Sequence, residues 1–222
     1  INDLLAENEK LEARAKARKA TAAQKGGAGT LFDEERSFFM NTREKTYKLV
    51  LSALFLALCL VLPILTGGIP AIGNMLLPMH IPVLLCGLIC GWQYGLVVGF
   101  VAPLLRSVLF GMPPMYPVAI AMAFELAAYG LIIGLVYAAV HKRGVAALYI
   151  SLLTAMVGGR LVWGLAEVVL LGMAGNAFTL QAFLSGALLS AVPGILLQLV
   201  LIPAVMVALD RTGVVRFQHA EG

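Results

Sequence analysis

Most of the chain beyond residue 47 consists of long apolar runs separated by short loops. A run of about 20 apolar residues can cross a bilayer as a helix, and hydrocarbon leaves a chain few other ways to satisfy its backbone polar groups. The sequence is 60% hydrophobic and only 13% charged, whereas soluble domains average about 25% charged residues. The sequence therefore predicts an all-α integral membrane protein.

The alternation of runs and loops predicts six transmembrane helices. The first run follows a basic segment and lacks an A-x-A cleavage site, so we expect an uncleaved helix rather than a signal peptide. The second run is short and begins at His-Ile-Pro. We place the spans at about 47–66, 79–91, 94–110, 117–140, 145–171 and 185–209.

The distribution of basic residues predicts the orientation. Six spans put both termini on one side, and the loops of the opposite side, 66–78, 111–116 and 172–184, contain no Lys or Arg. By the positive-inside rule, we expect both termini in the cytoplasm and the protein in the cell (plasma) membrane. The basic residues on the expected cytoplasmic side are Arg43, Lys45, Lys48, Lys142, Arg143, Arg211 and Arg216.

The first 39 residues differ in composition from the rest of the chain. They are rich in Ala, Glu, Lys and Arg, and MNTREKTYK, which begins at Met40, resembles an ordinary start before a first span. We expect 1–39 to be an upstream polar extension, helical or disordered, and either a fusion remnant or a dispensable tail, with a partner-binding helix as the alternative, and 40–222 to be the transmembrane domain. Because the basic excess lies beside the membrane, the pI near 9.1 does not indicate nucleic-acid binding.

Polar side chains within and just outside the predicted spans are the candidate binding groups, because ionisable groups are costly in hydrocarbon. Three of them lie at similar depth in the outer half of spans two to four, and three share one face of span five at i, i+3 and i+7. The inner halves are almost wholly apolar, which favours a pocket that opens outwards. The candidates are His80, Arg106 and Glu125, then Arg160, Trp163 and Glu167, with Asn74 and Tyr116 from the outer loops.

Structural roles for these residues remain open at this stage. The arginines and glutamates could pair as interhelical salt bridges. Trp163 could be an anchor at the membrane interface, and His80 could form a hydrogen bond at a helix end.

Small residues at four-residue spacing predict close helix contacts. Gly87, Gly91, Gly95 and Gly99 follow this spacing across spans two and three, and Gly130 and Gly134 follow it in span four. Ala53 and Ala57, with Ser52 beside them, predict a flat face on span one.

The sequence does not favour an enzyme. It has no H-E-x-x-H zinc motif and no G-x-S-x nucleophile with a facing membrane histidine. Cys59, Cys86 and Cys90 lie in apolar runs without a second pair of metal ligands, so we interpret them as packing residues. We expect no metal and no cofactor.

Residues 40–222 resemble the S components of energy-coupling factor (ECF) vitamin transporters. The resemblance rests on six predicted helices, the Ala53-x-x-x-Ala57 face, and the run PMHIPVLLCGLICGWQYGLVVGFVAPLLRSVLFGMPP. That run is similar to the family's x-I-P-x-L entry and its G-x-x-x-G-x-x-x-G turn.

The resemblance implies a substrate-binding subunit that works with partners. Outer segments 66–78 and 111–117 would be lids, and Ala53 and Ala57 would dock on a membrane T subunit. Two cytoplasmic ATPases would power toppling of the S component, which fits the absence of a G-x-x-x-x-G-K-[ST] phosphate loop in this chain.

The expected substrate is a small water-soluble vitamin or vitamin precursor. Arg106 and Arg160 suit a carboxylate, and Glu125 and Glu167 could accept hydroxyl, amide or amine donors. Pantothenate fits this mixture and the PMHIP…GMPP region, while other vitamins and queuosine-type precursors remain open. The alternative function is a stand-alone proton-coupled carrier of a small organic anion, although the sequence shows no internal repeat.

Overall fold

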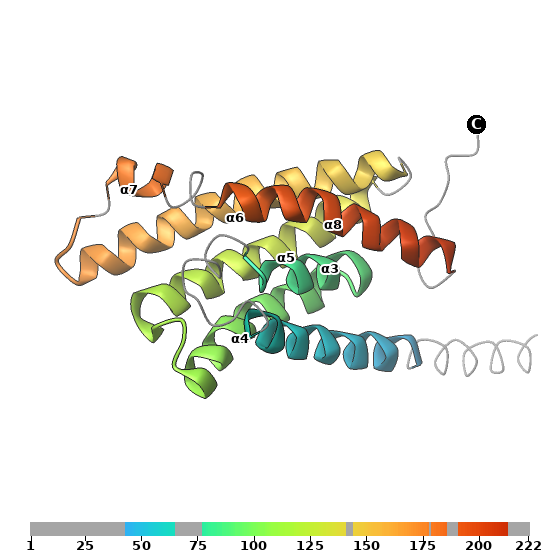
Figure 1. Ribbon diagram of the computed structural model, residues 1–222, viewed down its shortest axis with the longest axis horizontal. Helices are drawn as coiled ribbons and strands as arrows, with labels where there is room; N and C mark the ends of the chain where they lie inside the picture. The colour runs from blue at the N-terminus through green and yellow to red at the C-terminus, as the bar shows by residue number, and fades with distance from the viewer. Residues whose placement is uncertain (1–42, 65–76, 141–143, 178, 186–190, 213–222) are drawn as a thin grey trace, which may run out of the picture. The chain divides into compact units, whose positions relative to one another are not determined.

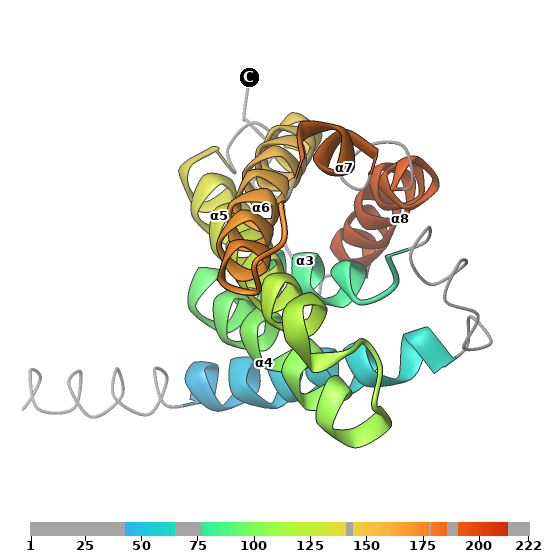
Figure 2. The same ribbon diagram turned by 90° about the vertical axis from the view of Figure 1, so that its left-hand side faces the viewer.

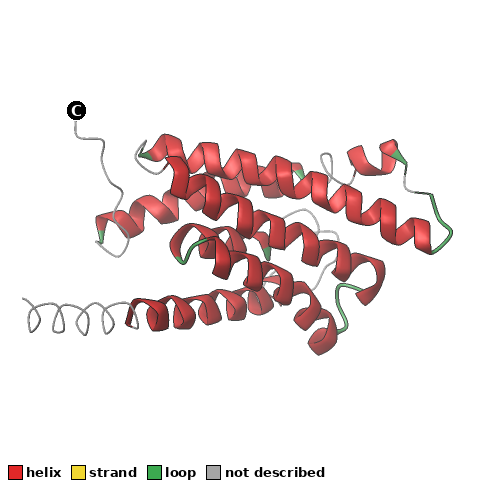
Figure 3. Cartoon of the chain, turned by 180° about the vertical axis from the view of Figure 1, so that it is seen from behind, coloured by secondary structure: helices red, strands yellow, loops and turns green. Residues whose placement is uncertain are grey.

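The computed structural model describes residues 43–64, 77–140, 144–177, 179–185 and 191–212. The chain divides into two units, 1–47 and 48–222, and almost all described residues belong to the second. All regular structure in these described ranges is helical (Figure 3). The predicted all-α class is therefore confirmed.

Five of the described helices are long and apolar enough to cross a membrane. Four of these both begin and end within a few residues of the predicted limits. The last begins at Val192, seven residues later than expected. The five are Arg43–Ile64, α4 (Trp92–Phe110), η1 with α5 (Met115–Ala119 and Ile120–Val140), α6 (Val145–Met173) and α8 (Val192–Arg211).

The predicted second span differs from the other five. It forms α3, His80–Ile89, whose ten residues rise only about 15 Å, half of a hydrocarbon core of about 30 Å. The sequence predicts a short second span, and the described helix is shorter still, since it ends at Ile89. Nine of its ten residues are buried, and α3 lies between the longer helices in Figure 2. Because protein surrounds it, α3 need not match the thickness of the membrane.

The loop expected over 172–184 also contains a short helix. It is α7, Leu180–Leu184, which lies between the ends of α6 and α8 in Figure 2. The short connection implied by the predicted limits of spans two and three is present, since α3 ends at Ile89 and α4 begins at Trp92.

Helix α5 is the centre of the packing, and it contacts α3, α4 and α6. Its contact with α4 is made backbone against backbone. A Cβ added to Gly95 would lie 2.8 Å from the carbonyl oxygen of Gly130, and one added to Gly99 would lie 2.3 Å from that of Leu126. The close approach predicted from the glycine spacing is thus confirmed at these positions.

Gly91 has a different role from the other glycines of its series. Among the residues that the structure describes, no atom lies within 4 Å of a Cβ built on it, but its φ is +100°. A residue with a side chain rarely adopts that backbone conformation. Gly91 therefore allows the turn between α3 and α4, rather than the close contact that its spacing predicts.

The helices alternate in direction. In Figure 1, α3, α5 and α8 run one way, and α4 and α6 run the other. The faces of the long helices that point away from α3 and α5 carry exposed Leu, Val, Ile and Phe side chains, such as Val97, Val157 and Val200. Such surfaces suit contact with lipid tails.

Candidate functional site

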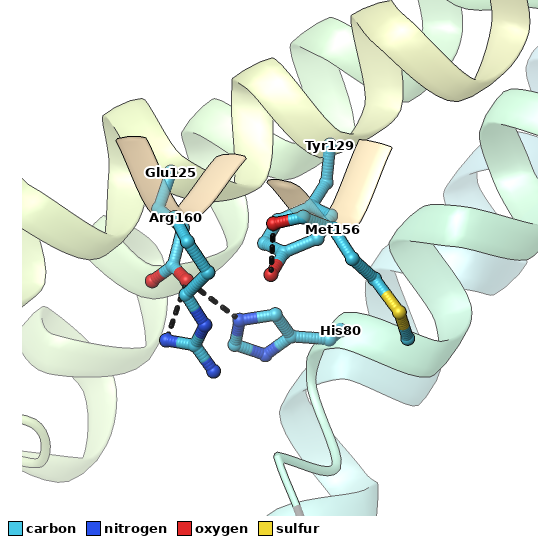
Figure 4. Close-up of polar contacts among 5 residues, drawn as sticks. All are labelled: His80, Glu125, Tyr129, Met156 and Arg160. Atoms are coloured by element: carbon cyan, nitrogen blue, oxygen red, sulfur yellow. Dashed lines mark hydrogen bonds and ion pairs between the residues drawn. The ribbon is translucent and has the colours of Figure 1, made fainter. Parts of the chain in front are cut away.

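A buried carboxylate joins three helices (Figure 4). Glu125 of α5 is only 2% exposed. Its Oε1 lies 2.8 Å from Nη1 of Arg160 on α6 and 3.5 Å from Nε2 of His80, the first residue of α3. The sequence predicts all three as site residues, and the structure brings them together.

An aromatic ring orients the histidine of this cluster. Tyr129 follows Glu125 by one turn of α5, and its ring meets that of His80 edge to face, with centroids 5.1 Å apart. The hydroxyl of Tyr129 donates to the carbonyl oxygen of Met156 at 3.5 Å. Gly159 leaves room for the ring, because a Cβ there would lie 2.7 Å from it. Tyr129 was not among the predicted residues, although its i+4 spacing from Glu125 places both on one face.

The guanidinium of Arg160 is paired along one edge only. Nη1 contacts Glu125, whereas Nε and Nη2 form no hydrogen bond with any residue that the structure describes. Within the same described ranges, Nδ1 of His80 also forms none. The Nε–Nη2 edge of a guanidinium offers two parallel N–H donors, which match the two oxygens of a carboxylate.

Two further predicted residues follow Arg160 on α6. Trp163 stacks on Phe183 of α7, with ring centroids 6.1 Å apart and an interplanar angle of 25°. The Phe183 ring also covers Gly164, where a Cβ would lie 2.4 Å from it. Glu167 is buried. This stretch of α6 therefore leads from the charged cluster to the part of α6 that α7 covers.

The structure gives Arg106 a separate environment. Its Nη1 donates to the carbonyl oxygen of Leu60 at 2.7 Å, and its guanidinium lies over the ring of Phe110, 5.3 Å from the centroid. No described contact joins Arg106 to His80, Glu125 or Arg160. The predicted spans place Arg106 at a membrane depth similar to that of His80 and Glu125. It nevertheless does not join the cluster, because α4 turns this side chain towards the first helix.

The remaining predicted residues lie at the periphery or outside the description. Tyr116, in η1, donates a hydrogen bond to the carbonyl oxygen of Leu170 near the end of α6. Asn74 lies outside the described residues. Ala53 and Ala57 are exposed on the Arg43–Ile64 helix, but Ser52 is buried and does not share their face.

The described residues include no group of three or more His, Cys, Asp or Glu side chains placed to hold a metal ion. The cluster is instead a set of hydrogen-bond donors beside one carboxylate. It can bind an anionic group and a neighbouring donor, and it presents no activated nucleophile.

Comparisons with known proteins agree with this description. The family model for the substrate-specific component of ECF transporters matches residues 47–209. This range includes the whole cluster and every helix discussed above, apart from the first residues of the first helix and the last residues of α8. Searches of curated proteins and of solved structures gave no match. Since the family model covers well over half of the 222 residues, the chain belongs to the family of ECF transporter substrate-specific components.

Proposed function

We propose that this chain captures a small carboxylate vitamin, with pantothenate the best candidate, at the cluster of His80, Glu125 and Arg160. The observation that carries the proposal is the buried guanidinium of Arg160, whose Nε and Nη2 form no hydrogen bond with the described residues. A buried cation with a free donor edge suits a carboxylate ligand. Family membership makes the protein a transporter subunit rather than an enzyme.

The other cluster groups fit the remaining chemistry of pantothenate. Glu125 can accept a hydrogen bond from a hydroxyl, and Nδ1 of His80 has no hydrogen-bond partner among the described residues. Trp163 and Glu167 lie on the same stretch of α6 and would extend the binding surface towards α7. The resemblance of the PMHIP…GMPP region to the pantothenate-type branch supports the same choice.

The outer segments would close over the bound vitamin. The hydrogen bond from Tyr116 to Leu170 connects the segment between α4 and α5 to the end of α6, which supports 111–117 as one lid. The second lid, 66–78, lies mostly outside the described residues and is proposed from the resemblance alone.

Uptake would require a T subunit and two ATPases. ECF substrate-specific components associate with such subunits, and the exposed Ala53 and Ala57 offer a smooth face for the T subunit. We place both termini in the cytoplasm, because the basic loop residues lie on that side of the predicted topology. Membership of a component family does not favour the alternative, a stand-alone proton-coupled carrier.

Binding and uptake of radiolabelled pantothenate test the proposal. Purified protein in detergent should bind pantothenate, and cells should accumulate it only when the T subunit and both ATPases are also expressed. Binding without any dependence of uptake on the ATPases would contradict the importer mechanism. Absence of pantothenate binding, with another vitamin found in the purified protein by mass spectrometry, would correct the substrate.

A further inference from the structure

One buried polar residue in α8 has no role in the cluster described above. Gln198 is 1% exposed, and its Nε2 forms no hydrogen bond with any residue in the described ranges. It lies on the buried stripe of α8, one turn from Gly194 on one side and from Ile202 on the other. An unpaired amide lowers the stability of an apolar interior, so this position needs a reason.

The packing of α8 places this stripe near the elements that form the cluster. Helix α8 contacts α3, which begins at His80, and α6, which carries Arg160. Its buried face is therefore turned towards the same interior.

Gln198 lies in the early part of its helix, as His80 and Glu125 do in theirs. Helices α3, α5 and α8 run in the same direction (Figure 1). His80 is the first residue of α3. Glu125 and Gln198 lie five and six residues after the first residues of α5 and α8, Ile120 and Val192, which is about 8–9 Å along each helix. Three parallel helices thus carry a buried polar group in their first two turns.

We propose that Gln198 is a further substrate-binding residue, whose Nε2 donates a hydrogen bond to a second acceptor oxygen of the substrate. Arg160 binds the carboxylate, and Gln198 binds an amide or other carbonyl oxygen of the same molecule. The site then selects small acids that carry a second carbonyl group. This inference rests on the proposed function and extends its site from α3, α5 and α6 to α8.

The test compares Gln198→Leu with Gln93→Leu. Leucine has a volume close to that of glutamine but no donor, and Gln93 is exposed in the first turn of α4. In detergent, Gln198→Leu should bind radiolabelled pantothenate about tenfold more weakly than wild type, as expected for loss of one hydrogen bond to a buried ligand. The ligand-free variant should melt at the same temperature as wild type or higher, because an unpaired amide has been removed. Gln93→Leu should change neither quantity.

A merely structural glutamine gives the opposite pattern. Unchanged pantothenate affinity, or a lower melting temperature of ligand-free Gln198→Leu, would overturn the proposal. If wild type does not bind pantothenate, the proposed substrate is wrong, and native mass spectrometry then measures the small molecule retained from the expression host. Lower occupancy in Gln198→Leu than in Gln93→Leu would still support the role of Gln198, and equal occupancy would reject it.

Discussion

At the scale of single residues, the pairing of Glu125 with Arg160 is the basis of the proposed binding site. Glu125 neutralises one edge of the guanidinium at 2.8 Å and leaves the other edge without a hydrogen bond to the described residues. A lone buried arginine would be costly, and a fully paired one would have no donor left for a ligand. The half-paired arrangement avoids both outcomes.

A substitution of Arg160 that keeps the positive charge but removes the paired N–H donors of the guanidinium tests this arrangement. Arg160→Lys preserves a cation beside Glu125 but removes the two parallel donors, so we expect pantothenate affinity to fall about tenfold or more. Equilibrium binding in detergent measures the change. The matched variant is Arg106→Lys, because Nη1 of Arg106 already donates to the carbonyl oxygen of Leu60. Its loss of pantothenate affinity should be clearly smaller. The reverse order would assign the carboxylate to Arg106.

Room for the Tyr129 ring is a second requirement at this scale. In Gly159→Ala the new Cβ would lie 2.7 Å from a rigid ring that also contacts His80. We expect a loss of about 1–3 kcal/mol in stability, as for overpacked cores, together with weaker pantothenate binding.

The neighbouring glycine provides the control for this substitution. In Gly158→Ala the Cβ would meet only the flexible Cδ1 end of Ile132, at 2.4 Å, so the variant should remain close to wild type. Melting temperature and affinity, measured for both variants, decide the matter. Equal effects at the two positions would show that the Tyr129 ring is not the cause.

At the scale of elements, glycines determine how closely α4 and α5 approach. The added Cβ of Gly95 would meet backbone atoms of Gly130 at 2.8 Å. Backbone cannot rotate away as a side chain can, so Gly95→Ala must separate the two helices. Glu125 lies on α5, which packs against both α4 and α6. The contact between α4 and α5 therefore also sets the position of Glu125.

Gly95→Ala should therefore destabilise the protein by about 1–3 kcal/mol. In Gly172→Ala, near the end of α6, no atom of the described part of the chain lies within 4 Å of the new Cβ, and the variant should be neutral or stabilising by less than about 1 kcal/mol. Thermal unfolding of both variants in the same detergent measures the difference. A neutral Gly95→Ala variant would mean that the helices tolerate a wider separation.

At the scale of the whole molecule, the proposed binding cluster and the proposed docking face are different surfaces. The cluster is buried between α3, α5 and α6, whereas Ala53 and Ala57 are exposed on the first helix. A change at one surface should therefore leave the other intact.

Ala53→Trp or Ala57→Trp should leave pantothenate affinity unchanged and reduce ATPase-dependent uptake at least tenfold, because a bulky ring prevents close helix contact. Ala204→Trp, at an exposed position on α8, controls for the effect of a large residue facing lipid. Uptake in cells that express all four subunits measures transport. Normal uptake by both first-helix variants would exclude this docking face.

The sequence by itself determined the class of the protein, most of its long helices and its family. These follow from local properties, namely the length of apolar runs, the positions of Gly and Pro, and the motifs between Pro78 and Pro114. The sequence also identified His80, Glu125 and Arg160, because an ionisable residue in an apolar run is conspicuous wherever it occurs. It also predicted a short second span, but it could not show that α3 is almost wholly buried between the other helices, because burial depends on how those helices pack.

Only the tertiary structure decided which side chains meet. Arg106 and Arg160 look alike as sequence, yet one binds the backbone at Leu60 and the other binds Glu125. Tyr129 belongs to the cluster because of the ring of His80, a contact between residues 49 positions apart. Such contacts depend on the rotation of each helix about its axis, and that rotation is set by packing over the whole bundle rather than by the local sequence.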